Sequence, residues 1–216
     1  SSQIKEIDKL STNKYGIPSL IRMEVAGLKS FDIIKKEYNP KKSLIVIGTG
    51  NNGGDGLVIA RYLLLNNYEC SIYIVKTSKI RSKDFITNLS IIKKLGVKIT
   101  NDWKNVKTKE YDLIIDGIFG VGLNRPLNSK INILIKTLNK TKIPICSIDI
   151  PSGLNPDSGK MLSTSIIADS TITFDFAKTG LLTDPGARFS KKIFIVKLPT
   201  PETLSKKLNN FYINDN

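Results

Sequence analysis

Residues 43–62, SLIVIGTGNNGGDGLVIARY, decide the fold of this chain. Leu44–Ile47 is a run of four apolar residues, which is typical of a strand buried on both faces of a parallel sheet. A pattern suited to a helix begins near Gly56. The turn between them, GTGNNG from Gly48, has the spacing G-x-G-x-x-G, in which small residues let backbone N–H groups approach a phosphate.

A glycine turn of this kind either binds a ligand or only joins a strand to a helix. An ordinary turn needs one polar residue, whereas this one carries three, Asn51, Asn52 and Asp55, around Gly53 and Gly54. The excess of polar side chains favours a binding loop.

Length and composition predict one globular α/β domain over residues 1–216, because 40% of the residues are apolar and 24% are charged. Without a long apolar run or a signal-peptide core, we expect a soluble cytoplasmic protein that spans no membrane. The opening Ser1-Ser2, without methionine, leaves open an organelle reached after removal of a targeting segment. Cys70 and Cys146 lie in apolar segments and are expected to be packed thiols.

The absence of histidine excludes Ser-His-Asp and Cys-His mechanisms and a histidine-ligated zinc. The net charge of +14 would suit an acidic partner, but the lysines are scattered in pairs without interleaved aromatic residues. We therefore interpret the charge as a basic solvated surface and expect no nucleic-acid groove.

Strand and helix patterns alternate along the chain. The first 40 residues suggest two helices, and beyond the glycine turn the predicted strands are 71–75, 97–99, 113–115 and 145–148, with helices at 85–95 and 131–138. This alternation predicts a Rossmann-like, three-layer αβα sandwich with a mostly parallel sheet.

Acidic residues follow two of the predicted strands at positions where such sheets bind ligands. Asp116 precedes a second glycine-rich turn, and Asp149 and Ser152 follow the strand after it. Each acid alone could brace a turn, but clusters at three strand ends favour a site. An NAD-dependent dehydrogenase is disfavoured, because the second strand ends in Val75-Lys76 without the acid that holds a ribose.

Three motifs in order resemble the YjeF N-terminal domain, the family of NAD(P)H-hydrate epimerases: GTGNNGGDGLVIARYL, DGIFGVGLNRP and SIDIPSGLN. YGIPSLIRMEVAG and ADSTITFDFAKTGLLTDPG extend the likeness over nearly the whole chain. The resemblance implies an isomerase of nicotinamide nucleotide repair that interconverts the R and S forms of hydrated NADH and NADPH, usually as a homodimer. It also implies one potassium ion per subunit and an NAD(P)HX dehydratase as functional partner, which many bacterial relatives carry as a fused domain.

The family's site residues are carried over to the matching positions. The potassium ligands match Asn52, Asp116 and Ser152. The substrate-binding residues match Asn51, Asn52, Gly53, Gly54, Asp55, Gly120, Val121, Gly122, Leu123, Asn124, Arg125, Pro126 and Asp149. Oxygen ligands of these types suit a hard cation.

Our mechanistic hypothesis makes Asp149 the catalytic acid and base for loss and return of the C6 hydroxyl. Some relatives carry a lysine in the second glycine loop, but this chain has Leu123-Asn124-Arg125 there, so no catalytic lysine is assigned. The alternative is a non-catalytic dimeric scaffold, or RNA-associated binding module, of the same fold.

Overall fold

The computed structural model describes residues 2–78 and 80–205, and its centre is a seven-stranded sheet in the order β3-β2-β1-β4-β5-β6-β7. All neighbouring strands in it run parallel, which confirms the predicted Rossmann-like sheet. The strands are β1 (Lys42–Ile47), β2 (Glu69–Ile74), β3 (Lys98–Thr100), β4 (Leu113–Gly117), β5 (Ile145–Ile148), β6 (Ser170–Phe174) and β7 (Lys192–Val196).

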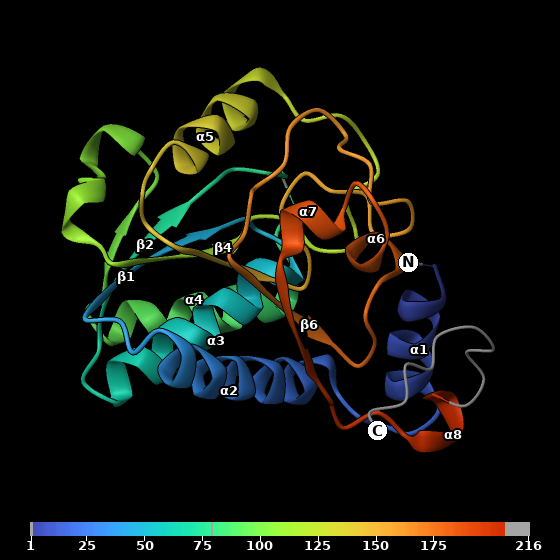
Figure 1. Ribbon diagram of the computed structural model, residues 1–216. Helices are drawn as coiled ribbons and strands as arrows, with labels where there is room; N and C mark the ends of the chain where they lie inside the picture. The colour runs from blue at the N-terminus through green and yellow to red at the C-terminus, as the bar shows by residue number, and fades with distance from the viewer. Residues whose placement is uncertain (1, 79, 206–216) are drawn as a thin grey trace.

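Helices cover both faces of this sheet. In Figure 1, α2, α3 and α4 lie on one face and α5 on the other, while α1 lies beside α8 at the edge of the molecule. The helices are α1 (Ser2–Asn13), α2 (Ser19–Glu37), α3 (Asn51–Leu65), α4 (Lys83–Lys94), α5 (Ser129–Asn139), α6 (Thr179–Leu182), α7 (Ala187–Ser190) and α8 (Glu202–Ser205), with 3-10 turns at Trp103–Asn105 and Thr108–Glu110.

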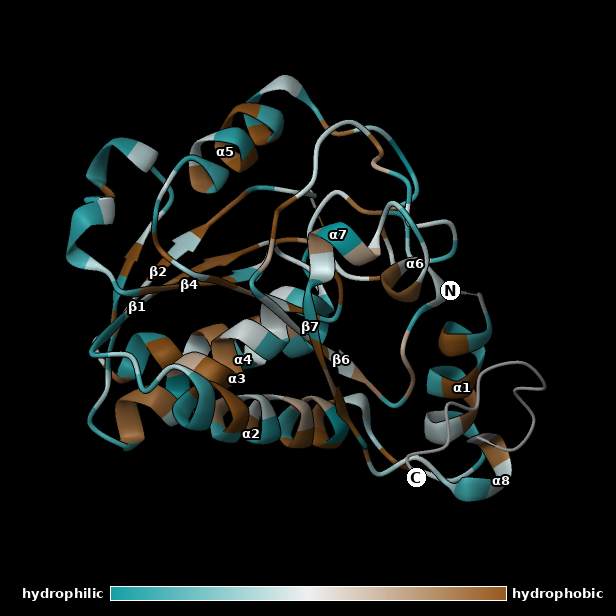
Figure 2. Cartoon of the chain, in the orientation of Figure 1, coloured by the Kyte–Doolittle hydropathy of each residue, from teal (hydrophilic) through white to brown (hydrophobic). Residues whose placement is uncertain are grey.

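Alternate residues of the central strand β1 supply the two cores. Ile45 and Ile47 pack under α2, α3 and α4, whereas Leu44 and Val46 pack under α5. All four are almost completely buried, as expected for a strand covered on both faces. Figure 2 shows the same layering, with apolar strands in the middle and polar residues on the outer faces of the helices.

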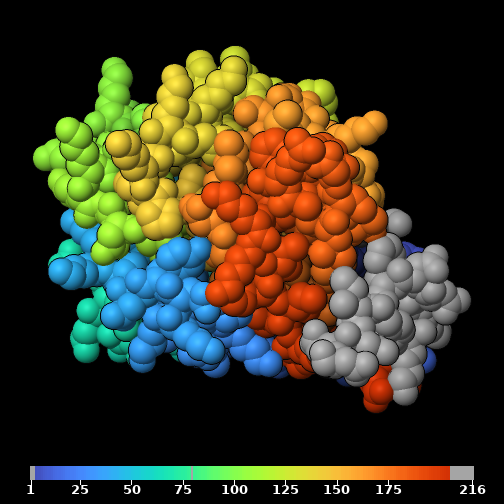
Figure 3. All heavy atoms as spheres, viewed as in Figure 1, coloured from blue at the N-terminus to red at the C-terminus, as the bar shows by residue number. Residues whose placement is uncertain are grey.

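The late strand β7 extends the sheet beyond the strands that the sequence pattern predicted, and α2 packs against it. Lys192 of β7 forms an ion pair with Glu37 of α2, and the Lys29 ammonium donates a hydrogen bond to the carbonyl of Lys197. In the space-filling view, the late segments in orange and red lie directly beside the blue of the amino-terminal half (Figure 3).

Cys70 and Cys146 are buried free thiols, as predicted. Burial raises the pKa of both thiols to about 12, so they stay protonated and act as packing groups. Within the described part of the chain, no helix combines the length and the apolar character needed to cross a membrane.

Candidate active site

A cavity of about 760 Å³ opens at the carboxyl ends of the strands. The strand order reverses direction here, because β1 lies between β2 and β4, and the chain leaves β1 and β4 towards opposite faces. Open parallel sheets bind ligands at this kind of switch point. Residues at or after the ends of β1, β2, β4, β5, β6 and β7, and residues of α1 and α2, line the cavity, and we call it the carboxyl-end cavity.

The first glycine loop differs from the prediction at one point: α3 begins at Asn51, five residues before the expected start near Gly56. A side chain at Gly53 would place its Cβ 2.1 Å from the carbonyl oxygen of Gly48, so only glycine lets the helix begin so close to β1. The N-cap Gly50 provides no capping side chain. The first-turn N–H groups of a 15-residue helix are thus open to an anionic ligand at the cavity.

The predicted substrate-binding residues divide into those that line the cavity and those that support it. Among the described residues, the lining includes Asn51, Asn52, Asp55, Gly120, Val121, Gly122, Leu123, Asn124, Arg125 and Asp149. Gly53, Gly54 and Pro126 are absent from that lining. Gly54 instead gives room to Met23 of α2, whose Cε would lie 2.6 Å from a Cβ there. The two interior glycines therefore shape the loop without facing the cavity.

Asp149 projects its carboxylate into the cavity from the residue after β5. Its φ of 68° is uncommon for a residue other than glycine, and its N–H donates to the carbonyl of Ile172 in β6 at 2.6 Å. Oδ2 accepts a hydrogen bond from the N–H of Val121 at 3.1 Å, and Oδ1 lies 2.5 Å from the ammonium of Lys178. The backbone and both carboxylate oxygens are thus fixed.

Asp55 is a second carboxyl group in the lining of the same cavity. Burial, and next the negative charge of Asp149, raise the pKa of Asp55 well above 3.8. The charges of Asp8 and Asp84 act in the same direction, and Lys178 acts against them. Two carboxyl groups in one cavity, one ion-paired and one favouring its protonated form, can serve as base and acid.

Asp116 and Ser152, two predicted metal ligands, bind each other beneath the cavity. The Ser152 hydroxyl donates to Asp116 Oδ1 at 2.6 Å, and the Ser152 N–H donates to Oδ2 at 2.9 Å. The Ser147 hydroxyl and the Ile118 N–H complete this set. Burial raises the pKa of Asp116, and these hydrogen bonds oppose the rise.

The third predicted metal ligand, Asn52, contacts the end of β5. Its amide nitrogen donates to the carbonyl of Ile148 in β5 at 3.1 Å, while its Oδ1 is buried without a hydrogen-bond partner among the described residues. A buried amide oxygen without a partner fits a cation. No group of three or more His, Cys, Asp or Glu side chains in the described ranges is arranged to hold a metal, and the three predicted ligands are one carboxylate, one amide and one hydroxyl.

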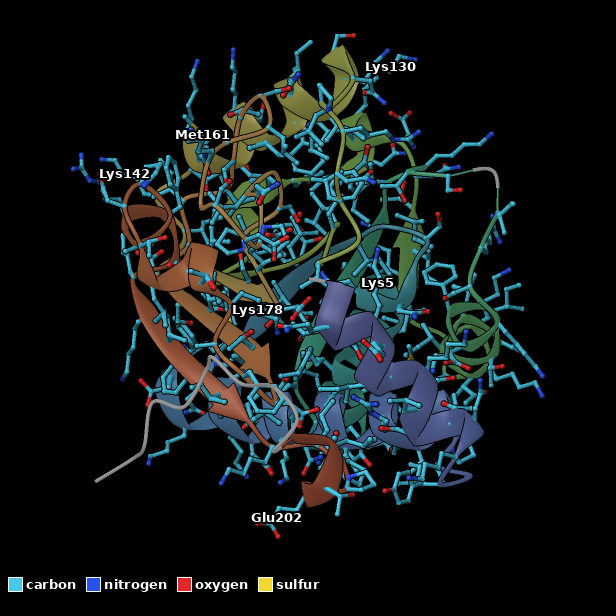
Figure 4. All side chains as sticks on the ribbon, turned by 90° about the vertical axis from the view of Figure 1, so that its right-hand side faces the viewer. Lys5, Lys130, Lys142, Met161, Lys178 and Glu202 are labelled. Carbon is cyan, nitrogen blue, oxygen red and sulfur yellow. The ribbon has the colours of Figure 1, made fainter. Side chains whose placement is uncertain are left out.

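Two parts of the cavity were missed from the sequence. Arg22 of α2 bridges Asp8 of α1 at 2.7 Å and Asp175 at 3.3 Å, which joins α1 to the wall. Lys178 follows β6 and forms the wall behind Asp149. Figure 4 looks onto this side and labels Lys178 near the centre, at the end of β6, and Lys5 on α1. The position of Lys178 after a fourth strand end was the available signal.

The chain matches known proteins over most of its length. A model of the family described as YjeF-related protein N-terminus matches residues 19–180. An NAD(P)H-hydrate epimerase of Limosilactobacillus fermentum is 36% identical over 90% of this chain and 93% of its own. An NAD(P)H-hydrate epimerase of Weissella koreensis is 34% identical over 89% of this chain and 87% of its own.

Two further relatives extend the comparison. The bifunctional NAD(P)H-hydrate repair enzyme Nnr of Moorella thermoacetica is 31% identical over 94% of this chain, which corresponds to 41% of that longer protein. The crystal structure of yeast ynu0 (YNL200c) superposes with a TM-score of 0.75 at 25% identity, covering 87% of this chain and 84% of the yeast chain. The family-model match over residues 19–180 includes both glycine loops.

Proposed function

Because this chain belongs to the YjeF-related protein N-terminus family, we propose that it is an NAD(P)H-hydrate epimerase, an isomerase that interconverts the R and S forms of hydrated NADH and NADPH at C6. The relatives with this name align along nearly their whole length. The observation in the structure that carries the proposal is the Asp149 carboxylate in the wall of the cavity. The Val121 N–H of the second glycine loop holds one of its oxygens, and the ion pair with Lys178 holds the other.

The chemistry needs a leaving hydroxyl and a stabilised cation. Loss of the C6 hydroxyl with a proton forms water and an iminium-like cation, in which the ring nitrogen shares the positive charge. Asp55, whose pKa is raised, is suited to donate that proton. The ion-paired Asp149 carboxylate stabilises the cation and accepts a proton from the water that adds to the opposite face. Proton exchange with solvent through the open cavity restores the starting state.

This scheme divides the roles that the sequence hypothesis gave to Asp149 alone. A carboxylate that accepts from Lys178 and from the Val121 N–H serves better as a base and as a counter-charge than as the first proton donor. An epimerase also needs proton transfer at both faces of the ring, and two carboxyl groups meet that need more simply than one.

The dinucleotide phosphates have two candidate binding elements. The first-turn N–H groups of α3, beginning at Asn51, favour an anion, and Arg125 in the second glycine loop adds a charge within the same cavity. Lys76 follows β2 where a dehydrogenase would carry an acid, which leaves space for a 2′-phosphate. Both NADHX and NADPHX are therefore proposed substrates.

Asn52, Asp116 and Ser152 are the proposed ligands of a potassium ion. The buried Asn52 Oδ1 without a partner supports it, and oxygen donors of three kinds suit a hard monovalent cation. When bound, the ion would supply positive charge beside the buried carboxylate. The chain's own contribution is to hold the second glycine loop against β5, because the Phe119 N–H donates to the Ser152 hydroxyl at 2.9 Å.

The proposed function also includes a partner enzyme, a homodimer and a cytoplasmic location. An NAD(P)HX dehydratase would consume the S form, in keeping with the bifunctional name of the Moorella thermoacetica relative. A homodimer and a cytoplasmic location are also proposed. The exposed Ile21 and Leu28 of α2, seven residues apart on one side of the helix, offer an apolar strip for a second copy.

A coupled assay tests the activity. R-NADHX is mixed with an S-specific dehydratase and its nucleotide, and the return of NADH absorbance is followed with and without this protein. We expect faster recovery with the wild type and a loss of that acceleration in Asp149→Asn, with KM little changed. A folded wild type that gives no acceleration over spontaneous epimerisation would reject the activity and favour the non-catalytic scaffold.

A further inference from the structure

Lys178 has a buried and fully occupied ammonium group. Its side chain is 2% exposed, and Lys178 is the N-cap residue of α6, four residues after the end of β6. The ammonium donates to the Thr173 hydroxyl at 2.7 Å and to the Phe174 carbonyl at 3.2 Å, and lies 2.5 Å from Asp149 Oδ1. Three acceptors match the three donors of a lysine, so the group is held in one place.

The contact fixes one oxygen of Asp149, and the second glycine loop fixes the other. The Val121 N–H reaches Oδ2, while Lys178 reaches Oδ1. The two donors come from loops that follow different strands, β4 and β6, and they grip a carboxylate that follows β5. Rotation of the carboxylate would break at least one of these contacts.

The charges around this pair explain why a cation is needed there. Asp55 on α3 and Asp8 on α1 both lie near enough to interact with the charge of Asp149. Arg22 of α2 bridges Asp8 and Asp175, so its charge is paired with those two carboxylates. In the described part of the chain, Lys178 is the cation that forms an ion pair with Asp149.

We propose that Lys178 is a positioning residue for the epimerase reaction: its ammonium holds the Asp149 carboxylate in a single orientation towards the substrate ring. The inference rests on the proposed function. It differs from a packing role, because it requires the positive charge and the donor at this point rather than the volume of the side chain. It also gives a function to the segment after β6, where the sequence suggested none.

Three substitutions separate charge from volume. Lys178→Met keeps the stem and removes charge and donors, Lys178→Gln keeps a neutral donor, and Lys178→Arg keeps the charge in a bulkier group. In the coupled assay we expect Lys178→Met to lower kcat by about 100-fold with KM little changed. Lys178→Arg should retain more kcat than the other two. A packing role predicts the reverse order, because methionine fits the space better than arginine.

Lys191→Met is the matched control. Lys191 lies 2.7 Å from Asp169 in an ion pair of similar length, but its side chain is 50% exposed and the pair lies near the amino-terminal end of β6, away from the cavity. We expect kcat and KM close to wild type in this variant. A comparable fall in kcat would mean that loss of any such lysine disturbs the enzyme, and would overturn the inference.

The outcomes distinguish this inference from the proposed function. No acceleration by the wild type would reject the function itself, whereas an active wild type with an equally active, folded Lys178→Met would reject only the role of Lys178. An effect on KM alone would also reject it. If circular dichroism shows that Lys178→Met is unfolded, Thr173→Val replaces it, since it removes one acceptor of the ammonium. Unchanged kcat in folded Thr173→Val would then count against the inference.

Discussion

The ion pair between Asp149 and Lys178 predicts a large and measurable coupling in stability. Asp149→Asn is the cleanest perturbation, because asparagine has the same shape and tolerates the φ of 68° at this position. The change leaves the Lys178 ammonium buried beside a neutral amide, and breaking a buried ion pair in this way costs about 3–5 kcal/mol. Two acceptors of Lys178 remain, so we expect the lower value, about 3 kcal/mol.

The assay is urea unfolding at pH 7 of the wild type, Asp149→Asn, Lys178→Met and the double variant. A loss of about 3 kcal/mol corresponds to a fall in Tm of about 6–12 °C for a chain of this size. The double variant removes both charges, so its loss should fall short of the sum of the single losses by about 2 kcal/mol. Additive losses would refute the reasoning, since they would show that the contact contributes no energy of its own.

The exposed pair of Lys191 and Asp169 provides the comparison for this cycle. Its side chains are 50% and 42% exposed, so water solvates either charge when the partner is removed. We expect a coupling below about 1 kcal/mol in the cycle of Lys191→Met and Asp169→Asn. Equal couplings in the two cycles would mean that burial in the cavity wall adds nothing to the inner pair.

Three further predictions concern the glycine loop, the ion and the second carboxyl group. In urea unfolding, Gly53→Ala should lower the free energy of unfolding by about 3 kcal/mol, because its Cβ would lie 2.1 Å from the Gly48 carbonyl oxygen. Gly50→Ala has nothing within 4 Å of its Cβ, so its free energy of unfolding should stay within about 1 kcal/mol of wild type. At a potassium concentration of about ten times Kd, bound potassium should stabilise the fold by about 1.4 kcal/mol. Replacing it by tetramethylammonium should therefore lower Tm by about 3–6 °C, and Asn52→Leu should remove that difference. Asp55→Asn should raise Tm at pH 7 while lowering kcat. The pKa of Asp55 is raised above 3.8, so the folded chain binds this proton more tightly, and wild-type stability falls as the pH rises from 3.8 through the folded-state pKa. The gain from Asp55→Asn should therefore disappear as the pH falls to 3.8, and a gain independent of pH would contradict the assignment.

Much of the fold was predictable because local patterns record it. Leu44–Ile47 is apolar at every position, and a strand buried on both faces requires that pattern. The start of α3 was placed wrongly because asparagine and glycine are weak helix formers, so Asn51–Asp55 suggested a turn. Tertiary contact with β1 and the cavity overrides that local preference.

The acidic half of the candidate site was predictable, and its basic half was not. Asp116 lies near the end of β4, Asp149 directly follows β5, and Ser152 lies in the turn after it, so the parallel topology brings all three to one edge of the sheet. Lys178 lies as far beyond β6 as Ser152 lies beyond β5, but it is one of 33 lysines and arginines, a residue class usually found on the surface. Its burial depends on acceptors from Asp149 and Thr173, a non-local arrangement that no periodicity records.

The glycines show why a motif identifies a site without explaining it. The spacing of the first loop suggests phosphate binding, yet Gly53 is required because the helix starts against the Gly48 carbonyl. In the second loop, a Cβ at Gly120 would lie 2.8 Å from Asp149 Oδ2. Glycine at that position gives the carboxylate room to accept from the Val121 N–H. A side chain at position 120 would therefore displace Asp149, the proposed base, before it affected any phosphate, so Gly120→Ala should lower kcat more than it raises KM.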